Sequence, residues 1–297
     1  MLHRIAIVRD KIPEEEAVPK SNEDGLNLSA DEQQMPEAQL IMRVFQGESG
    51  LVELFEAWES LMSRIDRQCF YHTPVWFNAF LKGETGPGGR INFFAIYRGN
   101  NLVAVIPLEF KVRGRFLKVR QASLPVREQL YMSDCAIADE ENKVRIIEFL
   151  LRNLRVAGYR WDIFAAADTL ENSCIATALH GLSSHRVVSK STDDCSLVAV
   201  SPYSELLKRV SPNFRKNINK RRRKLEGIPD VAFSIESDLN QVEATFDEFL
   251  TLESSGWKAG KSRARGDVTK PFAIALNEKK KNFYKRVVKE FAERGQM

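Results

Sequence analysis

The chain has 297 residues, of which 43% are hydrophobic and 28% charged, a composition typical of a globular protein with about two domains. Fibrous, collagen-like and wholly disordered proteins are therefore excluded. Lys and Arg number 44 and Asp and Glu 40, so the net charge is only +4. This small excess excludes a general affinity for nucleic acid, and any electrostatic signal must come from how the charges are distributed.

The cysteines and histidines show no pattern of a metal site. The four cysteines contain no Cys-x-x-Cys pair, and the four histidines form no His-x-x-x-His or His-Glu pair, so neither a zinc site nor a disulfide framework is expected. The first residues do not form a signal peptide, and no run approaches the roughly 18–20 apolar residues of a membrane span. The sequence therefore predicts a soluble, cytoplasmic protein.

Residues 1–40 are predicted to be a disordered acidic tail, because the stretch is rich in polar residues and lacks apolar periodicity. A first domain with a mixed, largely antiparallel sheet flanked by helices, of the α+β kind within the broader α/β class, is expected over 41–200. Its predicted helices are 51–65, a short helix after Pro74, 141–157 and 169–180. Its predicted strands are 91–97, 102–111, 116–122, 130–138, 161–167 and two within 186–200.

Two Ser-Pro pairs, Ser201-Pro202 and Ser211-Pro212, are typical of an N-cap serine followed by proline at the first helical position. They predict two helices in a connecting segment at 201–229, the second over about 212–226. The remaining residues, 230–297, are expected to begin a second domain with a strand at 231–236 and helices at 239–254 and 278–294.

The densest charge lies at 208–224, where nine cations occur without an acid: Lys208, Arg209, Arg215, Lys216, Lys220, Arg221, Arg222, Arg223 and Lys224. A helix that opens with Ser-Pro and carries basic side chains suits phosphate. A solvated basic face is an equally good interpretation. Nucleic acid is disfavoured, because the segment lacks the interleaved aromatics that stack on bases. Arg215, Lys216, Lys220 and Arg221 are the candidate acyl-donor or substrate-binding residues here.

Trp257 and Lys258 are a second candidate pair, because they lie in a glycine-containing loop that can close over a flat or anionic ligand. A Trp257 that fills the core beside a solvated Lys258 is the simpler alternative. His72 and Asp134 are possible general bases, although structural roles are favoured for both. No nucleophile elbow occurs, and the residues alone identify no catalytic group.

The order of several segments resembles the CelD-type acetyltransferases of cellulose biosynthesis. These belong to the GNAT acyl-CoA N-acyltransferase superfamily and are close to the tandem FemAB-like aminoacyl transferases. The similarity covers about 65–297. The segments that carry it are Phe70-Tyr71-His72-Thr73-Pro74-Val75-Trp76, the Pro107-Leu108 strand end, Trp161-Asp162-Ile163-Phe164, the basic helix from Ser211 to Leu225, and Phe249 to Lys258.

The resemblance implies two GNAT-like halves that transfer an acyl group from acyl-CoA to an amine or hydroxyl of a saccharide or envelope precursor in exopolysaccharide biosynthesis. Acetyl-CoA would be a co-substrate, and no bound cofactor or metal is implied. In GNAT-like folds a backbone N–H at a splayed strand polarises the thioester, so no fixed triad is needed. The phosphates of the donor would suit the basic helix.

The family pattern continues beyond the point where this sequence stops, so the sequence predicts a second half that is truncated from about 230 onward. Two other interpretations remain open at this stage. One is a non-catalytic module whose basic helix binds an anionic partner, and the other is an inactive fragment. The oligomeric state is not predicted.

Overall fold

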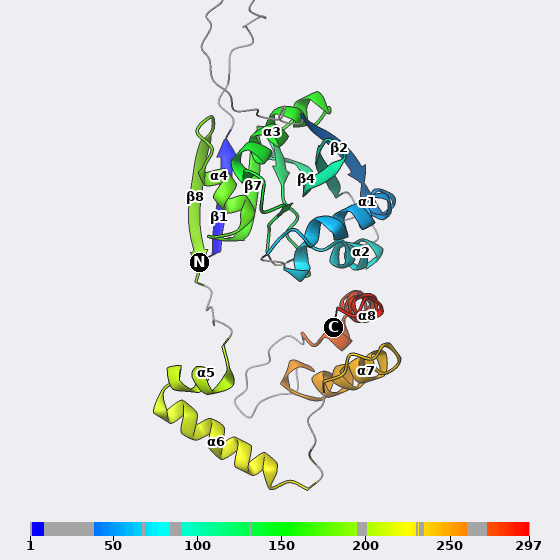
Figure 1. Cartoon of the computed structure of the whole chain (residues 1–297), viewed down its shortest axis with the longest axis vertical. Coiled ribbons are helices and arrows are strands. Elements are labelled where there is room, and N and C mark those ends of the chain that lie inside the picture. The colour runs from blue at the N-terminus through cyan, green and yellow to red at the C-terminus, as the bar shows by residue number, and fades with distance from the viewer. Residues whose placement is uncertain are drawn as a thin grey trace, which may run out of the picture. The chain divides into compact units, whose positions relative to one another are not determined.

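The computed structural model describes residues 2–8, 39–66, 69–83, 91–130, 132–194, 201–229, 231, 235–259 and 272–296. The chain divides into two compact units (Figure 1). Unit 1 consists of Met1–Asp193 with Glu278–Val287, and unit 2 of Asp194–Asn277 with Val288–Met297. Each unit is described by itself below.

Unit 1 is built on one mixed sheet. Its strands are β1 (Leu2–Val8), β2 (Leu40–Gln46), β3 (Asn92–Arg98), β4 (Asn101–Arg113), β5 (Val119–Ser123), β6 (Ala136–Ile137), β7 (Ile163–Leu170) and β8 (Arg186–Asp193). The order is β2-β3-β4-β5-β7-β1-β8, with β6 beside β4. Every pairing is antiparallel except that of β5 with β7. The predicted mixed sheet flanked by helices is thus confirmed.

Helices cover both faces of this sheet, because its central strands are apolar on both sides. On β3, Phe94 belongs to the core cluster under α3 (Lys143–Val156) and α4 (Cys174–His180). The next side chain faces the other way, and the Phe93 ring lies 5.4 Å from that of Trp58 in α1 (Gly47–Met62). Helix α2 (Pro74–Gly83) packs on the same side through Phe77. Unit 1 is therefore a three-layer structure.

Helix α3 shows how local sequence and burial agree. The side chain of Asn142 accepts the Arg145 N–H at 3.1 Å and so caps the helix. Gly158 follows the helix with a φ of 87°, the left-handed conformation that glycine adopts without strain. The buried stripe between these two ends is Ile146, Ile147, Leu150, Leu151 and Leu154. The predicted bounds of this helix, 141–157, are confirmed to within a few residues.

The N-terminus corrects one prediction. Residues 1–40 were expected to be a disordered tail, but Leu2–Val8 forms β1 and pairs antiparallel with β7 on one side and β8 on the other. Ile5 and Ile7 are fully buried there. The short run Ile-Ala-Ile-Val therefore lies inside the sheet, next to its edge strand β8, in a long-range pairing that its own sequence does not reveal. Residues 9–38 lie outside the described part of the chain.

Several element bounds also differ from the prediction. Strand β2 was not predicted at all, and β5 begins at Val119 rather than at Phe116, so Phe116 and Leu117 lie in the hairpin loop. Of the predicted strand 130–138, the described residues form only the two-residue strand Ala136–Ile137, and Leu130 makes an isolated bridge with Arg127. Of the two strands expected within 186–200, the first is β8, and residues 195–200 lie outside the described residues.

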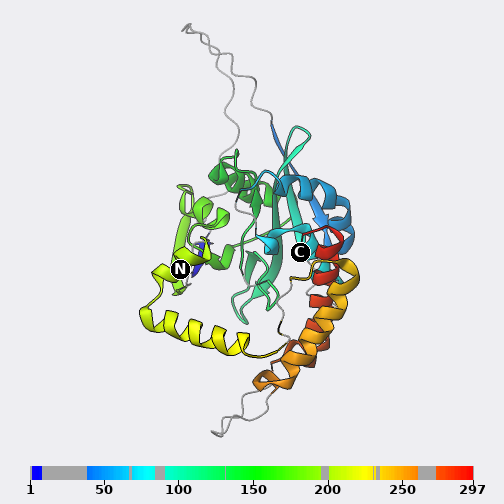
Figure 2. The same cartoon turned by 60° about the horizontal axis from the view of Figure 1, so that its bottom comes forward.

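The described residues of unit 2 contain helices and no strand. They include α5 (Tyr203–Arg209) and α6 (Pro212–Glu226), which Figure 2 shows as two successive helices in yellow-green and yellow. Next come α7 (Leu239–Ser255), the short 3-10 helices Trp257–Ala259 and Ile274–Leu276, and the end of α8 (Glu278–Glu293). Of the predicted strand 231–236, residues 232–234 lie outside the described residues, and 231, 235 and 236 are described but belong to no strand.

Candidate functional site

The two parallel strands of unit 1 separate at their carboxyl ends. Their register covers three pairs and ends at Ser123 and Ala165. One more bond follows, from the Leu124 N–H to the Ala165 carbonyl at 3.2 Å. The next bond of a parallel ladder would run from the Ala167 N–H to the Leu124 carbonyl, and the described residues do not form it. The Ala167 N–H therefore faces the space that β5 leaves.

Small side chains and a strained residue mark β7 at this point. Ala165 and Ala167 alternate with Phe164 and Ala166, which belong to the core under α3 and α4, so the two alanines point to the opposite face. Asp168 has a φ of 54° and is the one non-glycine residue of the described chain with a positive φ. Backbone strain of this kind occurs at binding and catalytic sites more often than elsewhere.

The chain that leaves β5 returns to β7 beside His72. The Ser133 N–H donates to the Asp168 carbonyl at 3.3 Å, and His72 hydrogen-bonds to the backbone of Met132. His72 Nε2 and the Ser133 hydroxyl are both buried, and neither has a hydrogen-bond partner among the described residues. Unpaired buried polar atoms are costly, and two of them next to one loop indicate a place for a polar ligand.

Burial lowers the pKa of the His72 imidazole below its ordinary value of 6.5. The charge of Asp134 and the bond to Met132 act in the opposite direction and are the smaller effects. His72 is consequently neutral near pH 7, the form in which an imidazole accepts a proton. His72 and Asp134 were both predicted from the sequence as possible general bases. In the structure, Asp134 belongs to the loop that follows β5, and His72 lies next to that loop.

Asp134 has a structural task that its sequence context did not reveal. Its carboxylate accepts three backbone N–H groups: Cys135 at 2.9 Å, Ile175 at 2.8 Å and Cys174 at 3.1 Å. Two of these donors are in the first turn of α4, where an anion satisfies unpaired N–H groups and the helix dipole. Asp134 therefore holds α4 against the loop, in agreement with the structural role favoured from sequence.

The thiols near this loop are unreactive. Burial, together with the smaller effect of the nearby Asp134 charge, raises the pKa of Cys174 to about 11. Burial likewise raises the pKa of Cys135 well above its ordinary value. Thiolate nucleophiles need lowered pKa values, so neither cysteine is a candidate nucleophile. The described residues contain no group of three or more His, Cys, Asp or Glu side chains that could hold a metal ion.

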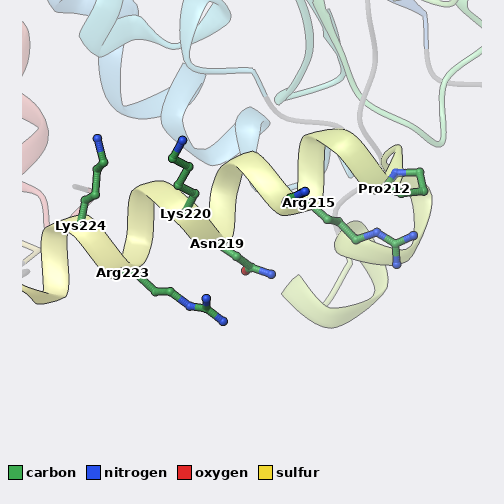
Figure 3. Close-up of a pocket in the computed structure, with 7 residues that line it drawn as sticks. Pro212, Arg215, Asn219, Lys220, Arg223 and Lys224 are labelled. Carbon is green, nitrogen blue, oxygen red and sulfur yellow. The ribbon is translucent and has the colours of Figure 1, made fainter.

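The second candidate site is the basic face of α6 in unit 2, which we define by Pro212, Arg215, Lys216, Asn219, Lys220, Arg223 and Lys224. These residues recur at spacings of three and four and so share one side of the helix. These residues line an open hollow, and Figure 3 shows Lys220 and Lys224 on one side of the helix axis and Arg223 on the other. No carboxylate of the described chain pairs with any of its five cations.

Local sequence explains why α6 forms without burying any residue. Ser211 caps it by accepting the Phe214 N–H at 3.3 Å, and Pro212 follows in the first turn, as predicted. Ser201 does not act in this way, because α5 begins after Pro202 with no side-chain cap. The three apolar residues of α6 lie opposite the basic face, and Phe214 and Leu225 are more than half exposed.

The predicted binding residues of α6 thus fall into two groups. Arg215, Lys216 and Lys220 line the hollow, whereas Arg221 does not. Arg223 and Lys224 line it too, although they were not selected from the sequence. Arg222 faces elsewhere and pairs with Glu226 at 2.7 Å. The helical spacing from Arg215 would have identified Arg223 and Lys224.

Lys258 has a partner within unit 2. Its Nζ lies 2.8 Å from Oε1 of Glu253, a side chain only 4% exposed. The other carboxylate oxygen of Glu253 accepts the Ile274 N–H at 2.8 Å. The predicted ligand-binding lysine therefore joins the end of α7 to the segment before α8. The Trp257 side chain lies outside the described residues.

Comparison with known proteins finds no match: no family model, no curated protein and no solved structure is similar to the chain.

Proposed function

We propose that the protein is an acyltransferase that moves an acyl group from an acyl-CoA to an amine or hydroxyl of a saccharide or cell-envelope precursor. The observation that carries the proposal is the separation of β5 and β7, the only parallel pair in the described sheet. A GNAT-like enzyme requires a backbone N–H beside such a gap, and the Ala167 N–H occupies that position. The small side chains of Ala165 and Ala167 leave room for a thioester.

The reaction needs one proton acceptor besides this donor. An acceptor amine attacks the thioester carbonyl, a C–N bond forms and the C–S bond breaks. The amine loses a proton, and the departing CoA thiolate gains one. We assign the first transfer to His72, because its buried Nε2 has no partner among the described residues and burial keeps the imidazole neutral.

Transfer from labelled acetyl-CoA to a panel of amino sugars tests the proposal directly. We expect label in an acid-stable product, with loss of about 100-fold or more in kcat for His72→Gln. Ser184→Ala, a change at an exposed hydroxyl, is the matched control and should keep full activity. Absence of both transfer and acyl-CoA binding would overturn the proposal.

A second candidate function is anion binding by α6 without catalysis, which is favoured by the five cations of its basic face that have no acidic partner among the described residues. The test replaces Lys216, Lys220 and Lys224 by glutamate. Retained acetyl-CoA binding with loss of binding to an anionic partner would favour this module. Loss of acetyl-CoA binding would instead show that α6 holds the donor phosphates, as the resemblance implies.

A further inference from the structure

The loop between β4 and β5, residues 114–118, exposes two apolar side chains next to each other. Phe116 is 95% exposed and Leu117 78%. They were predicted to begin a strand, which would have turned them to opposite faces of the sheet. In the structure the last pair of the ladder is Arg113 with Val119, so both residues extend beyond the sheet.

A glycine determines the shape of this tip. Gly114 has a φ of 92°, and a Cβ at this position would lie 2.0 Å from the Leu117 carbonyl oxygen. Only glycine therefore permits the turn that places Phe116 and Leu117 at the end of the hairpin. The exposure of these side chains follows from a defined backbone conformation.

Three cations surround the tip. Arg113, Arg115 and Lys118 are all exposed, and the guanidinium of Arg115 lies 5.7 Å from the centre of the Phe116 ring. Outside the tip, Lys111 pairs with Glu109 and Arg120 with Asp162. Within the described chain no carboxylate pairs with the three tip cations. The tip thus combines uncompensated positive charge with apolar side chains.

We propose that this hairpin tip docks the protein on the surface of an anionic membrane. Phe116 and Leu117 would enter the boundary between headgroups and acyl chains, and the three cations would contact lipid phosphates. The inference goes beyond the proposed acyl transfer, because the tip is at the amino end of β5 and the separated strands are at its carboxyl end.

The size and shape of the tip favour a membrane over a protein partner. Two such side chains bury roughly 300–400 Å² in all, whereas a standard protein interface buries about 800 Å² on each partner. A convex tip also lacks the concavity that a small molecule needs. Nucleic acid would explain the cations but not the exposed Leu117, because single strands are bound through stacked aromatic rings.

The experiment is cosedimentation of the full chain with phosphatidylcholine vesicles, with and without about a third of phosphatidylserine. We expect binding only to the anionic vesicles. Phe116→Ser/Leu117→Ser should weaken binding about 100-fold or more, because each apolar side chain that enters the membrane contributes about tenfold or more. Arg113→Gln/Arg115→Gln/Lys118→Gln should weaken it about 100-fold, because each cation near the surface contributes about fivefold.

Two controls match these changes. Val52→Ser alters an apolar side chain 63% exposed on α1, and Arg155→Gln/Arg160→Gln/Lys190→Gln alters three exposed cations elsewhere in unit 1. Both should bind as the parent does, and thermal melting should show that all variants fold. Equal binding to neutral vesicles, unchanged binding of the tip variants, as large a loss of binding in the control variants, or preferential binding of an oligonucleotide would each overturn the proposal.

Discussion

The two units of this chain are stabilised in different ways. In unit 1, large side chains such as Trp58, Phe93 and Phe164 are fully buried between a sheet and its helices. In unit 2, α5 and α6 bury no residue and α7 buries only Val242 and Leu250. Caps and ion pairs are prominent there instead. Unit 1 therefore derives its stability from apolar burial, whereas the described helices of unit 2 depend on local polar contacts.

The largest expected effect concerns the core of unit 1. Trp58→Ala removes a ring that lies 5.4 Å from both Phe77 and Phe93, and should lower the free energy of unfolding by about 3–5 kcal/mol. Phe214→Ala, on the exposed stripe of α6, should change it by about 0.5 kcal/mol or less. Denaturant melts of both variants measure the difference, and equal losses would abolish the distinction between the units.

The next effect concerns the polar contacts of unit 2. Glu253→Gln removes the charge that binds Lys258 and weakens the acceptor of the Ile274 N–H. We expect a local loss of about 1–3 kcal/mol, seen as faster hydrogen exchange in 272–276. Glu248→Gln, at an exposed site on the same helix, is the control. Exchange that stays slow in Glu253→Gln would show that this carboxylate does not hold the segment.

The stability of unit 1 is also expected to depend on pH through the buried His72. Burial lowers the pKa of His72, so below its ordinary value of 6.5 the unfolded chain binds more protons than the folded one. The free energy of unfolding of unit 1 should therefore fall as the pH falls through 6.5 toward the lower pKa of the folded state. His72→Gln should make this loss smaller, and an unchanged pH profile would contradict the assignment.

The smallest effect is expected at the cap of α6. Ser211→Ala leaves the Phe214 N–H without its acceptor and should cost about 1 kcal/mol of helix stability. Exchange of the first turn of α6 reports it. Ser204→Ala, inside α5, offers no cap to lose and should leave exchange unchanged. A similar response in both variants would show that the cap does not hold α6.

The sequence was most informative where structure is decided locally. The predicted bounds of α6 follow from Ser211 as its cap, and those of α3 agree with the structure although its cap, Asn142, was not predicted. It was least informative where strands pair over a long range. Strand β1 inserts between β7 and β8, and the residues Leu2–Val8 do not indicate that their partners lie more than 150 residues away. The predicted strands 102–111 and 116–122 imply a turn between them, but its actual length, which exposes Phe116, was not predicted.

For the candidate site, sequence reasoning found the cations of α6 and named His72, yet it could not place His72 against the loop that rejoins β7. The sequence could not predict the role of the Ala167 N–H. Every residue except proline has such a donor, and this one differs from the others only because the neighbouring strand β5 separates from β7. Lys258 was selected for its charge, and its buried partner Glu253 explains why it does not remain available as a free cation.

The gap between β5 and β7 is the feature on which the proposed acyl transfer depends. Calorimetric titration of acetyl-CoA into the full chain tests the role of this gap most directly. We predict binding at one site per chain that is lost in Ala167→Leu, because the larger side chain fills the space beside the Ala167 N–H. Ala157→Leu, at an exposed position after α3, should bind as the parent does. Absence of binding by the parent, or equal binding by Ala167→Leu, would contradict the account.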